Sequence, residues 1–187
     1  MPVTLRPARK DDADLLVRII DMAGEGLPRI LWEEIGGPGA DPWEIGRSRA
    51  LRDSGGFSWR NATVAELAGQ AAGAIITYPT GTAPELPDAG TPPVVAPLME
   101  LEALAPETCY VNAVAVLPGA RRQGVAQALM AAPAPGPRGM SLIVTDRNVA
   151  ARALYARLGY TERARRPLVA GRWLTEAREW VLMTRPD

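Results

Sequence analysis

The chain has 187 residues, of which 47% are hydrophobic and 22% charged, an ordinary globular composition that excludes disorder as its main state. Its 21 basic and 21 acidic residues cancel, which argues against a general nucleic-acid binder, because such a protein needs excess cations along the phosphates. The length favours a single domain over residues 1–187, with room for a hydrophobic core.

The sequence contains no histidine and one cysteine, Cys109. Without histidine there is no Ser-His-Asp triad, no papain-like pair, no H-E-x-x-H zinc site and no histidine base. A lone cysteine forms neither an internal disulfide nor a cysteine-rich zinc site, and it fits a reducing compartment. Any catalysis by this chain therefore has to use other residue types.

The N-terminal stretch MPVTLRPARKDDAD lacks the apolar core of a signal peptide. No apolar run approaches the roughly 18 residues of a transmembrane helix. We therefore expect a soluble, cytoplasmic protein without a membrane partner.

The N-terminal half predicts helices followed by a hairpin. In chain order, the predicted elements are a strand at 3–6, a helix from Asp11 or Asp12 to Ala23, a short helix at 27–35, a helix from Pro42 to about Arg52, and strands at 62–67 and 71–78. The third helix has a clear start signal, because Asp41 can cap it, Pro42 stands in its first turn, and Glu44 follows three residues after the cap.

The C-terminal half predicts more strands. In chain order, we expect a long loop at 80–97, a strand at Leu98–Leu104, a strand at Cys109–Leu117, a helix ending at Ala132, a strand at Met140–Val144, a helix at Asn148–Leu158, and strands at 160–166 and 179–184. The alternation in the first of these strands places Glu100 and Glu102 on one side. Small apolar residues at 109–117 are typical of a central strand covered on both faces. The elements together predict a single domain of the mixed α/β class.

A strand, a tight turn and a helix start follow one another in the stretch VAVLPGARRQGVA at 114–126. Unpaired amides at a helix start favour an anion, and Gly124 lets a phosphate approach the backbone. Arg121 and Arg122 add positive charge at the rim. Small residues also join strands to helices for packing alone, so this stretch by itself leaves both an anion site and a packing role open.

A second motif, NVAARALYARLGY at 148–160, follows a predicted strand. Asn148 can cap the helix or present its amide to a ligand. Tyr155 lies at the border of the apolar face, and Gly159 is a stop signal. Taken alone, this motif is more typical of a plain helix with a core tyrosine than of a ligand site.

In this order, the two stretches resemble the motifs of the GNAT superfamily of acyl-CoA-dependent N-acyltransferases. The family pattern Arg/Gln-x-x-Gly-x-Gly/Ala is similar to Arg121, Gly124 and Ala126, and the pattern Asn-x-x-Ala-x-x-Leu-Tyr-x-x-x-Gly-Phe/Tyr is similar to Asn148, Ala151, Leu154, Tyr155, Gly159 and Tyr160. The resemblance covers roughly residues 110–160. It implies a GNAT-type fold with a central mixed, mostly antiparallel sheet of six to seven strands and helices on both faces.

The resemblance also implies acetyl-CoA as the acyl donor, with no metal. The strand residues implied to bond the pantetheine arm through their backbone are Val114, Ala115 and Val116, and the turn residues implied to hold the pyrophosphate are Arg121, Arg122, Gln123, Gly124, Val125 and Ala126. Asn148 would bond the pantetheine, and Tyr155 would protonate the departing CoA thiolate.

The sequence departs from the family pattern at the turn and after it. Arg122 stands where glycine is most common, which leaves the turn more crowded and more positive. Three prolines, Pro133, Pro135 and Pro137, stop the following helix early, so the adenine end could be held differently.

The general base is the weakest element of the resemblance. Many relatives place a Glu or His on the strand face that carries Tyr110 and Asn112 here, and neither of these residues is a good base. Glu100 or Glu102 could act through water, or the amine could arrive already neutral; the alternative is that both glutamates lie on a solvated strand face. Our candidates are Glu102 as the base, with Glu100, Tyr110 and Asn112 in contact with the acceptor.

Two further residues have a functional and a plain interpretation. Trp32 lies in the segment that forms the acceptor wall in GNAT-like folds, so the resemblance makes it an acceptor-binding candidate, although core packing explains it equally well. Cys109 could carry an acetyl group, but a lone cysteine on a central strand is more often a small buried hydrophobe.

The predicted function is transfer of an acetyl group from acetyl-CoA to a primary amine of a small molecule or peptide, by direct attack without a covalent enzyme intermediate. The alternative is a non-catalytic GNAT-like domain that binds acyl-CoA as a sensor or interaction module. The resemblance also allows a homodimer, because dimers are common in the family.

Overall fold

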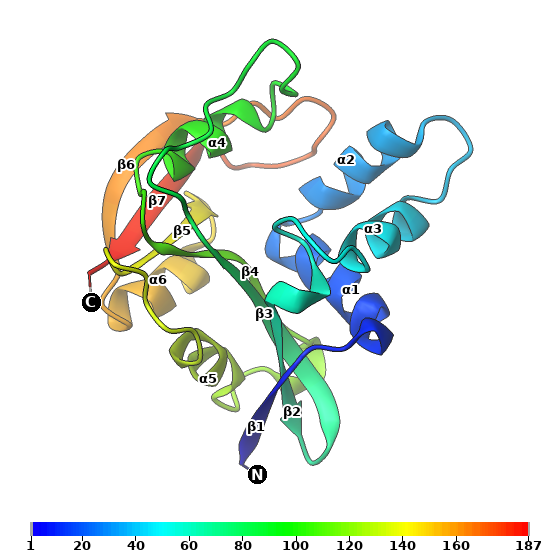
Figure 1. Ribbon diagram of the computed structural model, residues 1–187, viewed down its shortest axis with the longest axis vertical. Coiled ribbons are helices and arrows are strands. Elements are labelled where there is room, and N and C mark those ends of the chain that lie inside the picture. The colour runs from blue at the N-terminus through cyan, green and yellow to red at the C-terminus, as the bar shows by residue number, and fades with distance from the viewer. Residues whose placement is uncertain (1, 187) are drawn as a thin grey trace. The chain divides into compact units, whose positions relative to one another are not determined.

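Seven strands in the order β1-β2-β3-β4-β5-β7-β6 form the sheet of the computed structural model, which describes residues 2–186 (Figure 1). The described chain divides into two compact units, with residues 2–78 and 112–133 in unit 1 and residues 79–111 and 134–186 in unit 2. Strand β4 contributes residues to both units. The mixed, mostly antiparallel sheet and its six α-helices confirm the predicted fold class, whereas the single domain over 1–187 stays a prediction.

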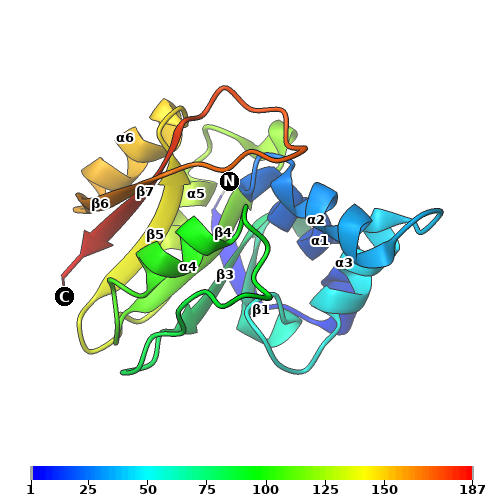
Figure 2. The ribbon, with the colours of Figure 1, turned by 90° about the horizontal axis from the view of Figure 1, so that it is seen from above.

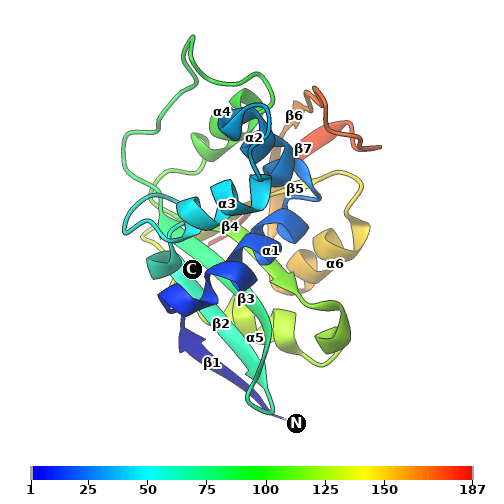
Figure 3. The ribbon, with the colours of Figure 1, turned by 90° about the vertical axis from the view of Figure 1, so that its right-hand side faces the viewer.

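Unit 1 contains most of the N-terminal half. Its elements are β1 (Val3–Pro7), α1 (Ala13–Ala23), α2 (Leu27–Gly36), α3 (Pro42–Ala50), β2 (Ala62–Leu67), β3 (Gln70–Pro79), the carboxyl part of β4 (Cys109–Val116), and α5 (Val125–Ala131). Strands β1, β2 and β3 are antiparallel neighbours. Helix α5 packs against β1 and β2, and Figure 3 shows it on the opposite face from α1 and α3.

The core of unit 1 lies between the first three helices and one face of the sheet. Leu16 and Ile19 of α1 are fully buried and belong to the same apolar cluster as Val64 of β2 and Ile76 of β3. The predicted start of α3 is confirmed, because the Asp41 carboxylate accepts a hydrogen bond from the Trp43 amide at 2.9 Å. A capped, amphipathic helical layer therefore covers this face of the strands.

Unit 2 contains most of the C-terminal half. Its elements are α4 (Ala96–Glu102), the amino part of β4, β5 (Met140–Thr145), α6 (Val149–Arg157), β6 (Thr161–Pro167) and β7 (Glu179–Arg185). Strand β5 pairs in parallel with β4 and antiparallel with β7, and β7 pairs antiparallel with β6. Figure 2 shows α4 and α6 on opposite faces of these strands.

The strand predicted at Leu98–Leu104 is wrong, because this segment forms helix α4. The helix buries Pro97 and Leu101, which are four residues apart, against β5, β6 and β7. An apolar pattern of only seven residues does not distinguish a strand from a helix. The residues at 98–103 are also mostly good helix formers. Glu100 and Glu102 therefore do not lie on a strand.

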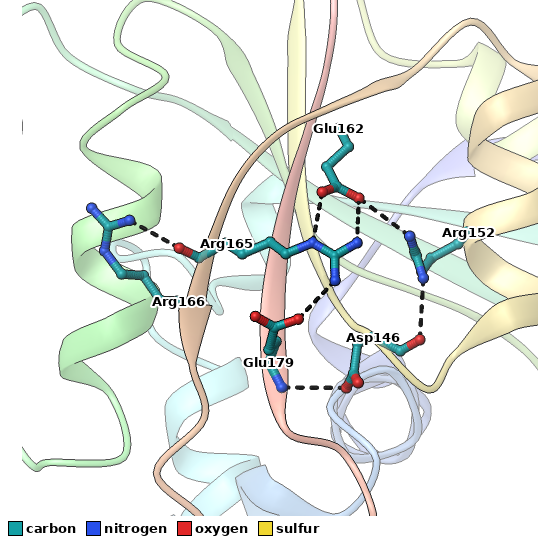
Figure 4. A network of polar contacts seen from close by, with 6 residues as sticks. All are labelled: Asp146, Arg152, Glu162, Arg165, Arg166 and Glu179. Atoms are coloured by element: carbon teal, nitrogen blue, oxygen red, sulfur yellow. Dashed lines mark hydrogen bonds and ion pairs between the residues drawn. The ribbon is translucent and has the colours of Figure 1, made fainter.

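The exposed strand β6 carries an ion-pair network (Figure 4). The Arg165 guanidinium donates to Glu162 at 2.6 and 2.8 Å and to Glu179 at 2.7 Å. Arg152 of α6 donates to the same Glu162 at 3.3 Å. Charged side chains on a strand at the end of the sheet order discourage pairing with other chains.

Asp12, at the start of α1, holds the end of β1 instead of capping the helix with its side chain. The Arg6 guanidinium donates to both of its carboxylate oxygens, at 2.7 and 2.9 Å, and the Arg9 amide donates at 2.7 Å. These hydrogen bonds, above all those from Arg6, hold the pKa of Asp12 below its ordinary value. A carboxyl group whose pKa is lower in the folded state stabilises that state above its unfolded pKa, and the effect is lost as the pH falls through the folded pKa.

We therefore expect Asp12→Asn to lower the free energy of unfolding by about 1–3 kcal/mol at pH 7. The difference from the wild type should shrink below about pH 4, where the unfolded carboxyl group is protonated. Urea unfolding at pH 7, 5 and 3 measures both effects. Asp11→Asn, at an exposed neighbour, is the matched control. A difference that stays constant down to pH 3 would contradict a charge-based role.

Candidate active site

Strand β4 continues beyond its pairing with β5. The parallel register joins three residue pairs, from Cys109 with Met140 to Val111 with Leu142. Residues 112–116 of β4 extend past the last of these pairs. The backbone at 114–116 is only partly buried, and the Leu117 amide donates to the carbonyl oxygen of Ala72 in β3 at 2.8 Å. The end of β4 is thus held by β3, beyond the last residue pair between β4 and β5.

The turn after β4 carries the first predicted motif. Residues 121–124 are exposed, and Gly124 enters α5 with a φ of 82°. The Ala128 amide donates to the carbonyl oxygen of Gly124 at 3.0 Å, so the preceding amides of the turn have no acceptor within the helix. The Gln123 side chain donates to the Gly119 carbonyl at 3.2 Å, and Arg121 donates to the Val116 carbonyl at 3.3 Å. The Arg121 amide donates to the Pro118 carbonyl at 3.4 Å, so the turn presents its later amides together with two exposed arginines.

Arg122 has a φ of 61°, in the left-handed region that favours glycine. This conformation explains why glycine suits the position in the family pattern. A non-glycine residue there carries about 1 kcal/mol of backbone strain. The chain thus keeps a cation in the turn at a small conformational cost. Helix α5 ends at Ala131, before the first of the predicted stop signals, Pro133.

The second motif lies on α6 in unit 2. The Asn148 side-chain oxygen accepts a hydrogen bond from the Ala151 amide at 3.2 Å, which confirms the predicted cap. Tyr155 is 8% exposed, and its ring lies 6.0 Å from the Tyr160 ring at an angle of 54°. The Tyr160 amide donates to the Tyr155 carbonyl at 3.0 Å, so the turn at Gly159 folds the second tyrosine back onto the first.

Tyr110 is a buried phenol on β4. Burial raises its pKa well above the usual range, and the charges of Glu102 and Tyr155 raise it further. The phenol therefore stays neutral at physiological pH and is no general base. The Glu102 carboxylate lies close enough to Tyr110 for its charge to raise the pKa of that phenol.

Glu100, in contrast, pairs with a cation on the surface. Its carboxylate accepts a hydrogen bond from Arg166 of β6 at 2.7 Å. The assignment of Glu102 as the base stays a prediction. Asn112 is partly buried, and its side-chain nitrogen is buried without a hydrogen-bond partner among the described residues.

Trp32 packs in the core of unit 1. It is 3% exposed, and a Cβ added to Gly46 would lie 2.7 Å from its ring. Its ring also meets Trp43 edge-on at 6.3 Å. Trp32 therefore has a packing role, and its contact with an acceptor stays a prediction.

Metal-binding clusters and membrane-spanning helices are both absent from the described part of the chain. No group of three or more Cys, Asp or Glu side chains at residues 2–186 is arranged to hold a metal ion. Over the same residues, every helix is too short or too polar to cross a membrane. Cys109 is partly exposed at the start of β4.

Known structures share this fold at low sequence identity. An N-acetyltransferase from Staphylococcus aureus Mu50 is 15% identical with a TM-score of 0.63, over 96% of this chain and 98% of that chain. The ribosomal-protein-S18-alanine N-acetyltransferase from Escherichia coli is 18% identical with a TM-score of 0.57, over 99% and 94%. Diaminobutyrate acetyltransferase EctA from Paenibacillus lautus, solved with L-2,4-diaminobutyric acid and coenzyme A, is 17% identical with a TM-score of 0.57, over 99% and 95%.

At these low identities, the TM-scores show a common fold only. The family is shown by a match of the sequence to a family model. No curated protein matches the chain. The acetyltransferase (GNAT) domain family matches residues 58–162, more than half of the chain, and this range includes both motifs. The chain therefore belongs to the GNAT acetyltransferase family.

Proposed function

We propose that the chain transfers an acetyl group from acetyl-CoA to a primary amine of a small molecule or peptide. The proposal rests mainly on the way β4 leads into the turn at 121–124, in a chain that belongs to the GNAT family. There, the β4 residues that follow the last pair with β5 lead into an exposed turn, which carries two arginines and the backbone amides that precede α5. A backbone edge suits an extended pantetheine arm, and amides with guanidinium groups suit a pyrophosphate.

The proposed donor contacts use the residues of the two motifs. Backbone groups of Val114, Ala115 and Val116 would bond the pantetheine as an added strand does. The amides of the turn at 121–126 would hold the pyrophosphate, with Arg121 and Arg122 adding charge. Asn148 already caps α6 through its oxygen, so its NH₂ group would be the donor toward pantetheine.

In the proposed reaction, the neutral amine attacks the thioester carbon directly. A new C–N bond forms, and a β4 amide would stabilise the oxyanion of the tetrahedral intermediate. The C–S bond then breaks, and the Tyr155 hydroxyl would give its proton to the CoA thiolate. Glu102 would receive the amine proton through water. The thioester is already activated, so alignment of the two reactants supplies much of the acceleration.

One observation favours a second candidate, a non-catalytic domain that binds acyl-CoA. Tyr110 is a neutral phenol and Glu100 is ion-paired, so two of the residues considered for the acceptor side have no basic role. This candidate keeps the same donor contacts and lacks only turnover. The two candidates therefore differ in CoA release and not in binding.

Calorimetric titration with acetyl-CoA, CoA and ATP, followed by a CoA-release assay over a panel of amines, tests both candidates. We expect micromolar binding of acetyl-CoA and no binding of ATP. Arg122→Gln should weaken acetyl-CoA binding several-fold, because it removes a cation from the turn, while Arg18→Gln, at an exposed residue of α1, should not. Binding with CoA release supports the enzyme, and binding without release to any amine supports the sensor. Failure to bind either CoA species would refute both.

A further inference from the structure

An arginine of α3 is partly desolvated without an anionic partner. The Nε atom of Arg49 is buried and has no hydrogen-bond partner among the described residues. Its guanidinium carbon lies 5.9 Å from the centre of the Phe57 ring. Arg47, in the same helical turn, also has a buried nitrogen without a partner, Nη1, but its Nε lies 3.4 Å from the Asp14 carboxylate. Arg49 has no such ion pair within residues 2–186.

The charges around Arg49 are unfavourable. Burial lowers the pKa of its guanidinium, and the positive charge of Arg52 lowers it further. The nearby carboxylate of Asp53 is engaged with Arg60 at 3.0 Å. A desolvated cation without a counter-charge destabilises the fold, and an apolar residue would pack against Phe57 without that cost. A bound anion would supply the missing counter-charge.

The position of Arg49 separates it from the turn that we assign to the pyrophosphate. A Cβ added to Gly56, next to Phe57, would lie 2.8 Å from the ring of Tyr78, near the carboxyl end of β3. The turn at 121–124, in contrast, follows Leu117, which bonds Ala72 near the amino end of β3. Tyr78 lies six positions after Ala72 on the strand, a separation of roughly 20 Å. An anion at Arg49 is thus a different one from the pyrophosphate.

We propose that Arg49 and Arg52 bind an oxyanion carried by the acceptor, so that the preferred substrates are amines that also bear a carboxylate or phosphate group. This inference rests on the proposed acetyl transfer. A guanidinium presents paired N–H groups that match the oxygens of either anion. The guanidinium lies over the Phe57 ring, and its outer N–H groups would donate to the ligand. Neither arginine takes part in bond making, so both act in substrate selection.

The activity test compares amines that differ only in the anion. The probes are ω-amino acids, the matching ω-amino carboxamides, and O-phosphoethanolamine with ethanolamine. We expect the wild type to have at least a tenfold higher kcat/KM for an anionic amine than for its neutral counterpart. Arg49→Met should abolish the preference through KM, Arg49→Lys should restore part of it, and Arg18→Met should retain it. The substrate pair that shows the larger preference for its anionic member tells whether the site prefers a carboxylate or a phosphate group. Equal efficiency with all pairs in the wild type would overturn the proposal.

A binding test is independent of turnover. Succinate and inorganic phosphate are titrated at constant ionic strength while thermal unfolding is followed. We expect one of these anions to raise the Tm of the wild type and of Arg18→Met but not that of Arg49→Met. Without anion, Arg49→Met should be at least as stable as the wild type, because it loses an uncompensated charge. Equal stabilisation of the wild type and Arg49→Met by both anions would refute the site. An absence of acetyl transfer to every amine would instead refute the proposed function, and this binding test would still decide on Arg49.

Discussion

Replacement of Tyr155 with phenylalanine is expected to lower kcat at least tenfold while the Kd for acetyl-CoA changes less than twofold. The hydroxyl is the proposed proton donor to the CoA thiolate, and general acids contribute roughly 100-fold or more to such steps. The ring itself is 8% exposed and packs on Tyr160, and phenylalanine keeps that packing. Steady-state CoA release together with calorimetry separates the two effects.

Tyr160→Phe is the matched control for Tyr155→Phe. The hydroxyl of Tyr160 is buried without a hydrogen-bond partner among the described residues, and burial raises its pKa to about 12. Its removal should leave kcat unchanged and the free energy of unfolding equal to that of the wild type or higher, by up to about 1 kcal/mol. If Tyr155→Phe turns over like the wild type, the acid assignment is wrong. If both variants lose activity equally, the tyrosine pair serves packing and not proton transfer.

Gly73→Ala should destabilise the protein and weaken acetyl-CoA binding together. A Cβ at Gly73 would lie 2.5 Å from the Ala115 carbonyl oxygen and 3.1 Å from the Val116 Cα, so β3 and β4 would have to move apart. We expect a loss of about 2–3 kcal/mol of stability, or a Tm lower by roughly 5–10 °C. Acetyl-CoA affinity should fall at least tenfold, because the displaced backbone is the proposed pantetheine edge.

Ala71→Val adds bulk to the same strand at an exposed position and is the control for Gly73→Ala. It should change the stability by less than about 0.5 kcal/mol and leave acetyl-CoA binding intact. Thermal unfolding and calorimetry of both variants provide the comparison. Gly73→Ala with normal stability but weaker binding would still place the β4 backbone in the donor site. Normal binding by a destabilised Gly73→Ala protein would argue against that placement.

Local signals in the sequence were sufficient for most elements. The Asp41 and Asn148 caps, the stop at Gly159 and the apolar face of α1 each act within a few residues, and the structure confirms them. The prediction for the segment at 96–102 was wrong, because an apolar pattern of only seven residues is too short to distinguish the period of a strand from that of a helix. Burial of Pro97 and Leu101 against strands that follow later in the chain decides in favour of the helix.

Apart from α4, the order of elements, both motifs and the resemblance to the GNAT family could be predicted from the sequence, because these depend on neighbouring residues and on fixed spacing. The state of individual side chains depends instead on the folded structure. Tyr110 is neutral because strands and helices bury it, and Glu100 is paired because Arg166, 66 residues away, lies beside it. The Nε atom of Arg49 is buried by the fold around α3 without a hydrogen-bond partner among residues 2–186, and no local pattern records that. Charge and solvation at a site are sums over contacts distant in sequence, and the chain must fold before they exist.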